Sequence, residues 1–156
     1  MKISGIDFSQ PSNVIIPIIR GNAEIIFQAC CIVDFTELDA VLKAPNPVLR
    51  LMRGSQEAKP VQDEKYKKEL EEFGRRRIDY IIAKSLLATP DLVWETVDFN
   101  NPETYKNYET ELQEAGFNTF QITQLATGAL EANGLSERKV TEAREHFLAG
   151  QQERSK

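Results

Sequence analysis

The sequence predicts an α+β fold that is mainly helical, with an N-terminal β-hairpin or small sheet, one long helix and a C-terminal three-helix unit. Two β-branched runs separated by the turn residues Gly21-Asn22 predict the hairpin. A helical pattern over residues 63–88, free of proline, predicts the long helix. Repeated capping and stop residues after residue 100 predict the three shorter helices.

The chain has 156 residues, 41% of them hydrophobic, which is enough for one modest core. Its net charge is −5, and the acidic excess lies in residues 89–156, with 12 acidic against 6 basic side chains. This excess fits either a solvated helical surface or a basic protein partner. We expect four regions, namely the hairpin with a short helix at 1–43, a linker at 44–62, a helical domain at 63–150 and a tail at 151–156 that frays.

The hairpin is predicted from Val14–Ile19 and Ala23–Val33. Pro17 has no amide hydrogen to donate, so the first strand is expected to lie at an edge. An isolated two-stranded hairpin is marginally stable in water, so this one should pack on the rest of the chain or on another subunit. A partner would need exposed apolar anchors. The candidate partner-binding residues of the hairpin are Ile15, Ile16 and Ile18.

Residues 34–43 are expected to form a short helix capped by Thr36, with Asp39 three residues later in a capping-box arrangement. Prolines and Gly54 in residues 44–62 predict a linker without regular structure. The apolar residues inside this linker leave three alternatives open: a short strand, a docking segment, or a loop that packs on its own domain.

The long helix is expected to begin at the N-cap Asp63 and to end before Thr89-Pro90. Its second half is far more apolar than its first, so the second half should be buried and the first should project into solvent or a partner. The basic residues of the first half leave open contact with nucleic acid, contact with an acidic protein, or ion pairs within the helix such as Glu72 with Arg76. The candidate partner-binding residues here are Tyr66, Leu70, Phe73, Arg76 and Arg77.

The connector after the long helix contains Trp94, which is expected to anchor it against the helices. Three helices should follow, at residues 101–116, 118–134 and 136–150. Their caps are Asn101, Asn118 and Ser136, and glycines mark their ends. Because the connections are short, the three helices are predicted to pack on one another.

No phosphate loop, dinucleotide fingerprint, nucleophile elbow or zinc spacing is present in the sequence. We therefore predict that the protein is not an enzyme and that it has no catalytic residues, no cofactor and no metal site. His146 is expected to have a structural or surface role rather than a catalytic one. The adjacent Cys30 and Cys31 should act as two small apolar residues, because a bridge between them would be strained.

Residues 1–7 lack a signal-peptide pattern, and the longest apolar runs are far shorter than the ~20 residues of a membrane span. The expected location is therefore the cytoplasm of the cell that makes the protein.

The sequence from residue 14 to residue 150, most strongly after Ser85, resembles small tail assembly chaperones of tailed bacteriophages. The features that carry this resemblance are structural and include no catalytic signature. They are Trp94-Glu95-Thr96-Val97, Asn101-Pro102-Glu103-Thr104-Tyr105, Glu111-Leu112-Gln113-Glu114-Ala115-Gly116-Phe117, Asn133-Gly134-Leu135-Ser136 and Glu142-Ala143-Arg144-Glu145-His146-Phe147-Leu148.

The resemblance implies a chaperone that binds the tape-measure protein and keeps it soluble during tail tube assembly. The implied partner is the tape-measure protein, and the major tail tube protein is a second candidate. Self-association through the edge strand of the hairpin, which the sequence itself predicts, would let copies line a long partner. No membrane partner is expected, and the acidic balance argues against nucleic acid. The implied location is the host cell cytoplasm, and the protein should be absent from the mature virion. The alternatives are a structural virion protein for tail completion or connection, and a small nucleic-acid-binding regulator.

Overall fold

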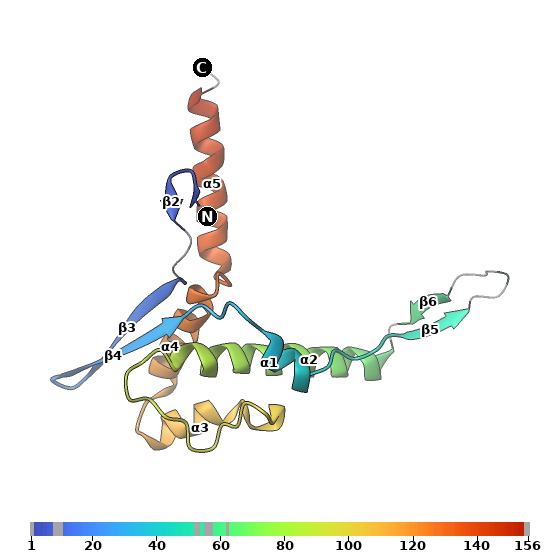
Figure 1. The fold of residues 1–156 in the computed structure, drawn as a ribbon, viewed down its shortest axis with the longest axis horizontal. Coiled ribbons are helices and arrows are strands. Elements are labelled where there is room, and N and C mark those ends of the chain that lie inside the picture. The colour runs from blue at the N-terminus through green and yellow to red at the C-terminus, as the bar shows by residue number, and fades with distance from the viewer. Residues whose placement is uncertain (1, 8–10, 52–53, 55–57, 62, 155–156) are drawn as a thin grey trace.

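The structure is a computed structural model that describes residues 2–7, 11–51, 54, 58–61 and 63–154. It confirms an α+β fold that is mainly helical (Figure 1). The strands form three antiparallel pairs: β1 (Lys2–Ile3) with β2 (Ile6–Asp7), β3 (Asn13–Arg20) with β4 (Ala23–Cys30), and β5 (Val48–Leu51) with β6 (Ala58–Val61). The helices are α1 (Thr36–Val41), α2 (Glu64–Leu86), the 3-10 helix η1 (Pro102–Thr104), α3 (Asn107–Glu114), α4 (Thr119–Ala132) and α5 (Glu137–Arg154).

The core lies where one face of the β3–β4 hairpin meets α4 and the second half of α2. Ile16 and Ile18 of β3 are buried there, together with Phe27 and Ala29 of β4. The hairpin therefore packs on the rest of the chain, which was one of the two predicted alternatives. The other buried apolar residues come from the helices and connectors, and they are Leu38, Leu42, Tyr80, Ile81, Ile82, Ala83, Leu86, Val97, Tyr105, Tyr108, Leu112, Ile122, Leu125, Ala129 and Ala132.

Helix α2 follows the prediction in both halves. The Asp63 carboxylate caps it by accepting a hydrogen bond from the Tyr66 N–H at 2.7 Å. The buried residues of α2 all lie between Tyr80 and Leu86, whereas the first half is largely exposed. Beyond the helix, the Thr89 hydroxyl accepts from the Gln28 N–H at 2.9 Å and donates to the Gln28 carbonyl at 3.0 Å. This pair of bonds attaches the end of α2 to the outer edge of β4.

The predicted caps of the first two C-terminal helices are confirmed. The side chains of Asn101 and Asn118 each accept a backbone hydrogen bond, and Asn118 forms a full capping box with Gln121. Gly116 adopts φ +90°, as expected for a left-handed helix end. The segment at 101–116 is divided into η1 and α3 rather than forming one continuous helix.

The connector is anchored by Trp94, as predicted. Its indole Nε1–H donates to the Ala83 carbonyl at 3.0 Å, and its ring meets Tyr108 edge-on. Glu111 also holds the connector by accepting hydrogen bonds from the backbone N–H groups of Glu95 and Thr96. Burial alone would raise the pKa of Glu111, but these hydrogen bonds together with that of the Thr96 hydroxyl lower it. Trp94 and Glu111 thus fix a segment that has no regular secondary structure.

The predicted packing of the third C-terminal helix is wrong. All side chains of α5 from Glu137 to Gln151 are exposed, and the helix extends away from the body (Figure 1). Its apolar stripe is narrow and the remaining positions are mostly charged or polar, so little apolar area would be gained by docking it. The helix also continues through Gly150 to Arg154, where a frayed tail was expected, and Ser155 and Lys156 lie outside the described residues.

Two further predictions for the N-terminal region are corrected. Thr36 does not cap α1. Instead Asp34 accepts from both the N–H and the hydroxyl of Thr36, and the hydroxyl bond, followed by the backbone bond, lowers the pKa of Asp34. The expected linker at 44–62 contains the β5–β6 pair, which extends beyond the start of α2 in Figure 1. Of the three alternatives for its apolar residues, the short strand is the one present, as β5. Both strands are edges, where a residue such as Pro60 is tolerated.

Helix α4 comes close to β3 at Gly128. A Cβ atom at this position would lie 2.3 Å from the Ile16 Cδ1 atom. We expect Gly128→Ala to lower the free energy of unfolding by about 1–3 kcal/mol, because the packed isoleucine must move. Gly74→Ala is the matched control, since nothing lies within 4 Å of its Cβ position in α2. This control should stabilise the protein by up to about 1 kcal/mol. Urea denaturation measures both, and equal stability of the two variants would contradict the expected overlap.

Candidate partner-binding surface

The two faces of the β3–β4 hairpin are chemically similar but differently buried. The register pairs Ile16 with Phe27 and Ile18 with Ile25 on the face that meets the helices. Because successive side chains of a strand point to opposite faces, their neighbours point outward. We call the outward set the hairpin outer face, and it consists of Ile15, Pro17, Ile19, Glu24, Ile26 and Gln28.

The hairpin outer face is apolar although it is open to solvent. Ile15 and Ile19 are each 65% exposed, and Ile26 is 43% exposed. An antiparallel sheet that faces water on one side normally carries polar residues there. A cluster of exposed apolar side chains on a small protein is typical of an interaction site. No described residue of this chain covers the cluster.

A groove of about 460 Å³ adjoins this face, between β3 and α4. One wall is formed by Val14–Pro17, and the other by α4 residues from Phe120 to Glu131, with Gly128 among them. Phe120 is 87% exposed, the most open large hydrophobic side chain among the described residues. The groove and the hairpin outer face share Ile15 and Pro17, so they form one continuous surface.

The outer edge of β3 is closed along part of its length. The Gln124 side chain donates from Nε2 to the Pro17 carbonyl at 3.2 Å, and Gln121 does the same to the Ile19 carbonyl, also at 3.2 Å. Pro17 itself has no N–H to offer. On the opposite edge, Thr89 already bonds both backbone groups of Gln28. The edge available for pairing with a strand of another copy is therefore shorter than the sequence suggested.

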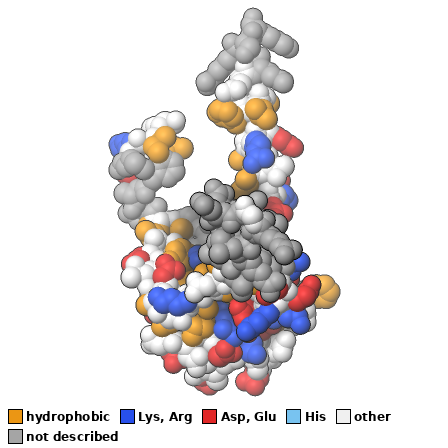
Figure 2. All heavy atoms as spheres, turned by 90° about the vertical axis from the view of Figure 1, so that its right-hand side faces the viewer, with side chains coloured by type: hydrophobic (Ala, Val, Ile, Leu, Met, Phe, Trp, Pro, Cys, Tyr) orange, Lys and Arg blue, Asp and Glu red, His pale blue; other side chains and the backbone are white. Residues whose placement is uncertain are grey.

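A second predicted surface lies on the first half of α2. Leu70 is exposed there, while Tyr66 and Phe73 are half-buried. Phe73 lines a smaller cavity of about 260 Å³ that also includes Leu42 and Pro45. The first half of α2 interleaves acidic and basic residues along the sequence EKYKKELEEFGRRR, and both signs are visible below the grey atoms in Figure 2. The charges of this half of the helix therefore do not form a field of one sign.

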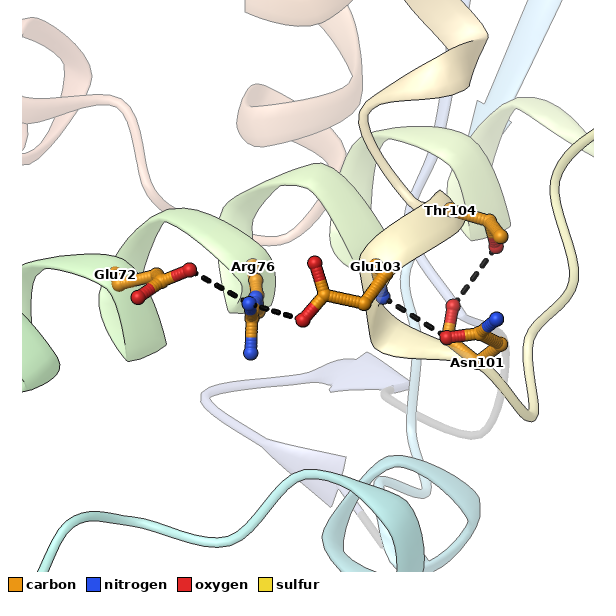
Figure 3. A network of polar contacts seen from close by, with 5 residues as sticks. All are labelled: Glu72, Arg76, Asn101, Glu103 and Thr104. Atoms are coloured by element: carbon orange, nitrogen blue, oxygen red, sulfur yellow. Dashed lines mark hydrogen bonds and ion pairs between the residues drawn. The ribbon is translucent and has the colours of Figure 1, made fainter.

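The two predicted arginines of α2 are engaged within the chain. Arg76 pairs with Glu72 at 2.6 Å and also with Glu103 of η1, so it links α2 to the C-terminal part (Figure 3). The Arg77 guanidinium lies over the rings of Phe35 and Phe73, 5.9 and 5.6 Å from their centroids. The predicted Glu72–Arg76 ion pair is thus present.

The structure divides the eight predicted partner-binding residues. Ile15 lies on the hairpin outer face, and Leu70 is exposed on α2. Ile16 and Ile18 are buried in the core at 4% and 1% exposure, so they cannot act as surface anchors, because strand alternation turns them inward. The remaining four, Tyr66, Phe73, Arg76 and Arg77, are partly buried on α2.

Three exposed, large apolar residues of the surface were not predicted from the sequence, and they are Ile19, Ile26 and Phe120. Because side chains alternate along a strand, Ile19 lies on the same face as Ile15. Once the inward face is known, this alternation predicts that Ile19 points outward. Phe120 lies off the stripe formed by Ile122, Leu125 and Ala129, which marks it as an outward apolar residue.

Comparison with known protein families, with functionally described proteins and with solved structures finds no match to this chain. Within the described residues, no cluster of three or more His, Cys, Asp or Glu side chains could hold a metal ion. In the same part of the chain, no helix combines the length and apolarity needed to cross a membrane.

The titratable groups with shifted pKa values lie away from the groove. Burial raises the pKa of Tyr80 to about 12, with smaller contributions from Glu37, Tyr105 and Asp34. Burial and the nearby Glu109 raise the pKa of Asp79 on α2. None of these groups lines the groove or the hairpin outer face. The surface described here is therefore suited to apolar contact rather than to proton transfer.

Proposed function

We propose that this protein is a tail assembly chaperone of a tailed bacteriophage, not an enzyme. It binds the tape-measure protein in the host cytoplasm and keeps it soluble while the tail tube assembles around it. The proposal is supported by the sequence resemblance given above. The observation that carries it is the apolar hairpin outer face, which none of the described residues covers.

The size of this surface suits a transient partner. Complete burial of one large aliphatic side chain contributes about 1.5–3 kcal/mol. The loss of translational and rotational freedom opposes binding by roughly 4–15 kcal/mol. One copy with a few anchors would therefore bind weakly and release readily. Several copies along one long partner would gain affinity through multivalency, and we propose that copies associate on this partner and make way for the tail tube protein.

Co-expression with the tape-measure protein tests the proposal. The intact chain should move the tape-measure protein into the soluble fraction, and a double variant, Ile19→Ser with Phe120→Ser, should not. The control is Val33→Ser, because Val33 is 82% exposed but lies outside the surface. A tape-measure protein that stays insoluble beside the intact chain would show that this function is wrong.

Quantitative mass spectrometry of purified virions separates the chaperone from a structural tail-completion protein. We expect the chain to be absent from mature particles. A stoichiometric amount in virions would favour the structural role. The nucleic-acid-binding alternative is weakened by the engagement of Arg76 and Arg77 within the chain.

A further inference from the structure

We infer that the hairpin outer face and the adjoining groove dock an amphipathic helix that carries basic residues beside its apolar anchors. This inference rests on the proposed function, since it names the kind of segment that the same surface binds.

The strand edge argues against an extended partner. A strand added to β3 needs free backbone donors and acceptors on its outer edge. Pro17 provides no donor, and the carbonyls of Pro17 and Ile19 already accept from Gln124 and Gln121. Such a strand would have to displace two hydrogen bonds and leave one of its own carbonyls without a partner. Binding through side chains does not incur this cost.

The apolar residues are spaced for a helix. Ile15 and Ile19 lie four residues apart on β3, which corresponds to about 13 Å along an extended strand. Anchors at positions i, i+4, i+7 and i+11 of a helix span about 17 Å along its axis, which covers this distance. Phe120 extends from the opposite wall of the groove. A helix laid over this surface can therefore place consecutive anchors against Ile15, Ile19 and Phe120.

The unpaired charge of the surface is acidic. Glu24 is the charged residue of the hairpin outer face, and it forms no ion pair within the described residues. Glu131, the charged residue of the groove wall, is already paired with Lys139 at 3.2 Å. Neither the hairpin outer face nor α4 contains a lysine or arginine. A helix with a flanking lysine or arginine complements Glu24, which promotes its association and selects against acidic helices.

Titration of the full chain with synthetic peptides tests the inference. The probe is a peptide of about 15 residues with leucines at i, i+4, i+7 and i+11 and lysines beside them. Isothermal titration calorimetry at low salt should detect its binding. The same peptide with glutamates in place of the lysines should bind at least tenfold more weakly. A peptide of the same composition with alternating leucine and lysine, which favours a strand, should bind no better than the glutamate version.

Two surface variants locate the site. Phe120→Ser and Ile15→Ser should each weaken binding of the lysine peptide at least tenfold while leaving the circular dichroism spectrum unchanged. Phe147→Ser is the matched control, because Phe147 is 64% exposed on α5, outside the surface. Equal binding of the acidic peptide, preference for the alternating peptide, or a loss of binding confined to Phe147→Ser would each overturn the inference. So would a dimer of the intact chain that excludes the peptide and dissociates in the Phe120→Ser variant.

The two proposals can fail separately. If the lysine peptide binds as expected but the tape-measure protein stays insoluble, the chaperone function is wrong and the docking surface remains. If the tape-measure protein is solubilised by the Phe120→Ser and Ile15→Ser variants as well as by the intact chain, the inferred helix site is wrong and the chaperone function remains.

Discussion

Replacing Ile18 by alanine is expected to lower the free energy of unfolding by about 2–5 kcal/mol, whereas Ile19→Ala should change it by less than about 0.5 kcal/mol. The two residues are adjacent and chemically identical. Ile18 is 1% exposed and packs in the core between β3 and the helices, while Ile19 points into solvent. Truncation at position 18 therefore leaves a cavity, and truncation at position 19 removes only a surface contact.

Chemical denaturation followed by circular dichroism measures both variants. Binding of the lysine peptide gives the complementary readout, since Ile19→Ala should weaken it while the folded fraction of Ile18→Ala should retain it. The pair thus separates the stabilising face of the hairpin from its binding face. Equal losses of stability in the two variants would contradict the strand register on which the surface is based.

Local chemistry explains which elements the sequence could predict. A cap is decided by residues three or four apart, so the signals at Asp63, Asn101 and Asn118 were sufficient to start three segments. The two halves of α2 differ strongly in apolar content. This difference alone predicts which half is buried, even when the elements that cover it are not known. The hairpin followed from its β-branched residues and its turn at Gly21-Asn22 for the same reason.

The inward face of β3 could not be chosen in the same way. The strand reads Val-Ile-Ile-Pro-Ile-Ile, so both faces carry isoleucine and alternation has no polar partner to reveal it. The choice depends on where α4 comes close, and Gly128 permits that approach at Ile16. This is why Ile16 and Ile18 were predicted as partner contacts together with Ile15.

The other errors also have tertiary causes. The helix of α5 was found, but short connections do not oblige it to pack when its apolar stripe is narrow. Within residues 44–62, prolines argued against regular structure, yet a two-stranded pair consists only of edges and tolerates them. In both regions the nearby sequence indicates whether a helix or strand forms. It does not indicate which other parts of the chain that helix or strand contacts.

Replacing Asn133 by alanine is expected to lower the free energy of unfolding by about 2–4 kcal/mol, because it removes the hydrogen-bond partners of the buried Ser85 hydroxyl and of the partly buried Ile32 N–H. The Asn133 Oδ1 atom accepts from the Ile32 N–H at 2.9 Å. Its Nδ2 donates to the Ser85 hydroxyl at 2.7 Å and to the Ala129 carbonyl at 2.8 Å. One side chain thus joins the end of α4 to α2 and to the segment after β4.

A double-mutant cycle with Ser85→Ala tests this network, because Ser85 is buried at 1% exposure and its hydroxyl contacts Asn133 directly. The two substitutions should be non-additive by about 0.5–3 kcal/mol. Asn46→Ala is the matched control, since Asn46 is exposed and has no side-chain hydrogen bond within the described part of the chain. If the two losses in free energy of unfolding were strictly additive, the hydrogen bond between Asn133 and Ser85 would contribute nothing, and Asn133 would serve only to end α4. Non-additivity would show that Asn133 couples the end of α4 to α2, the two helices on which the hairpin packs.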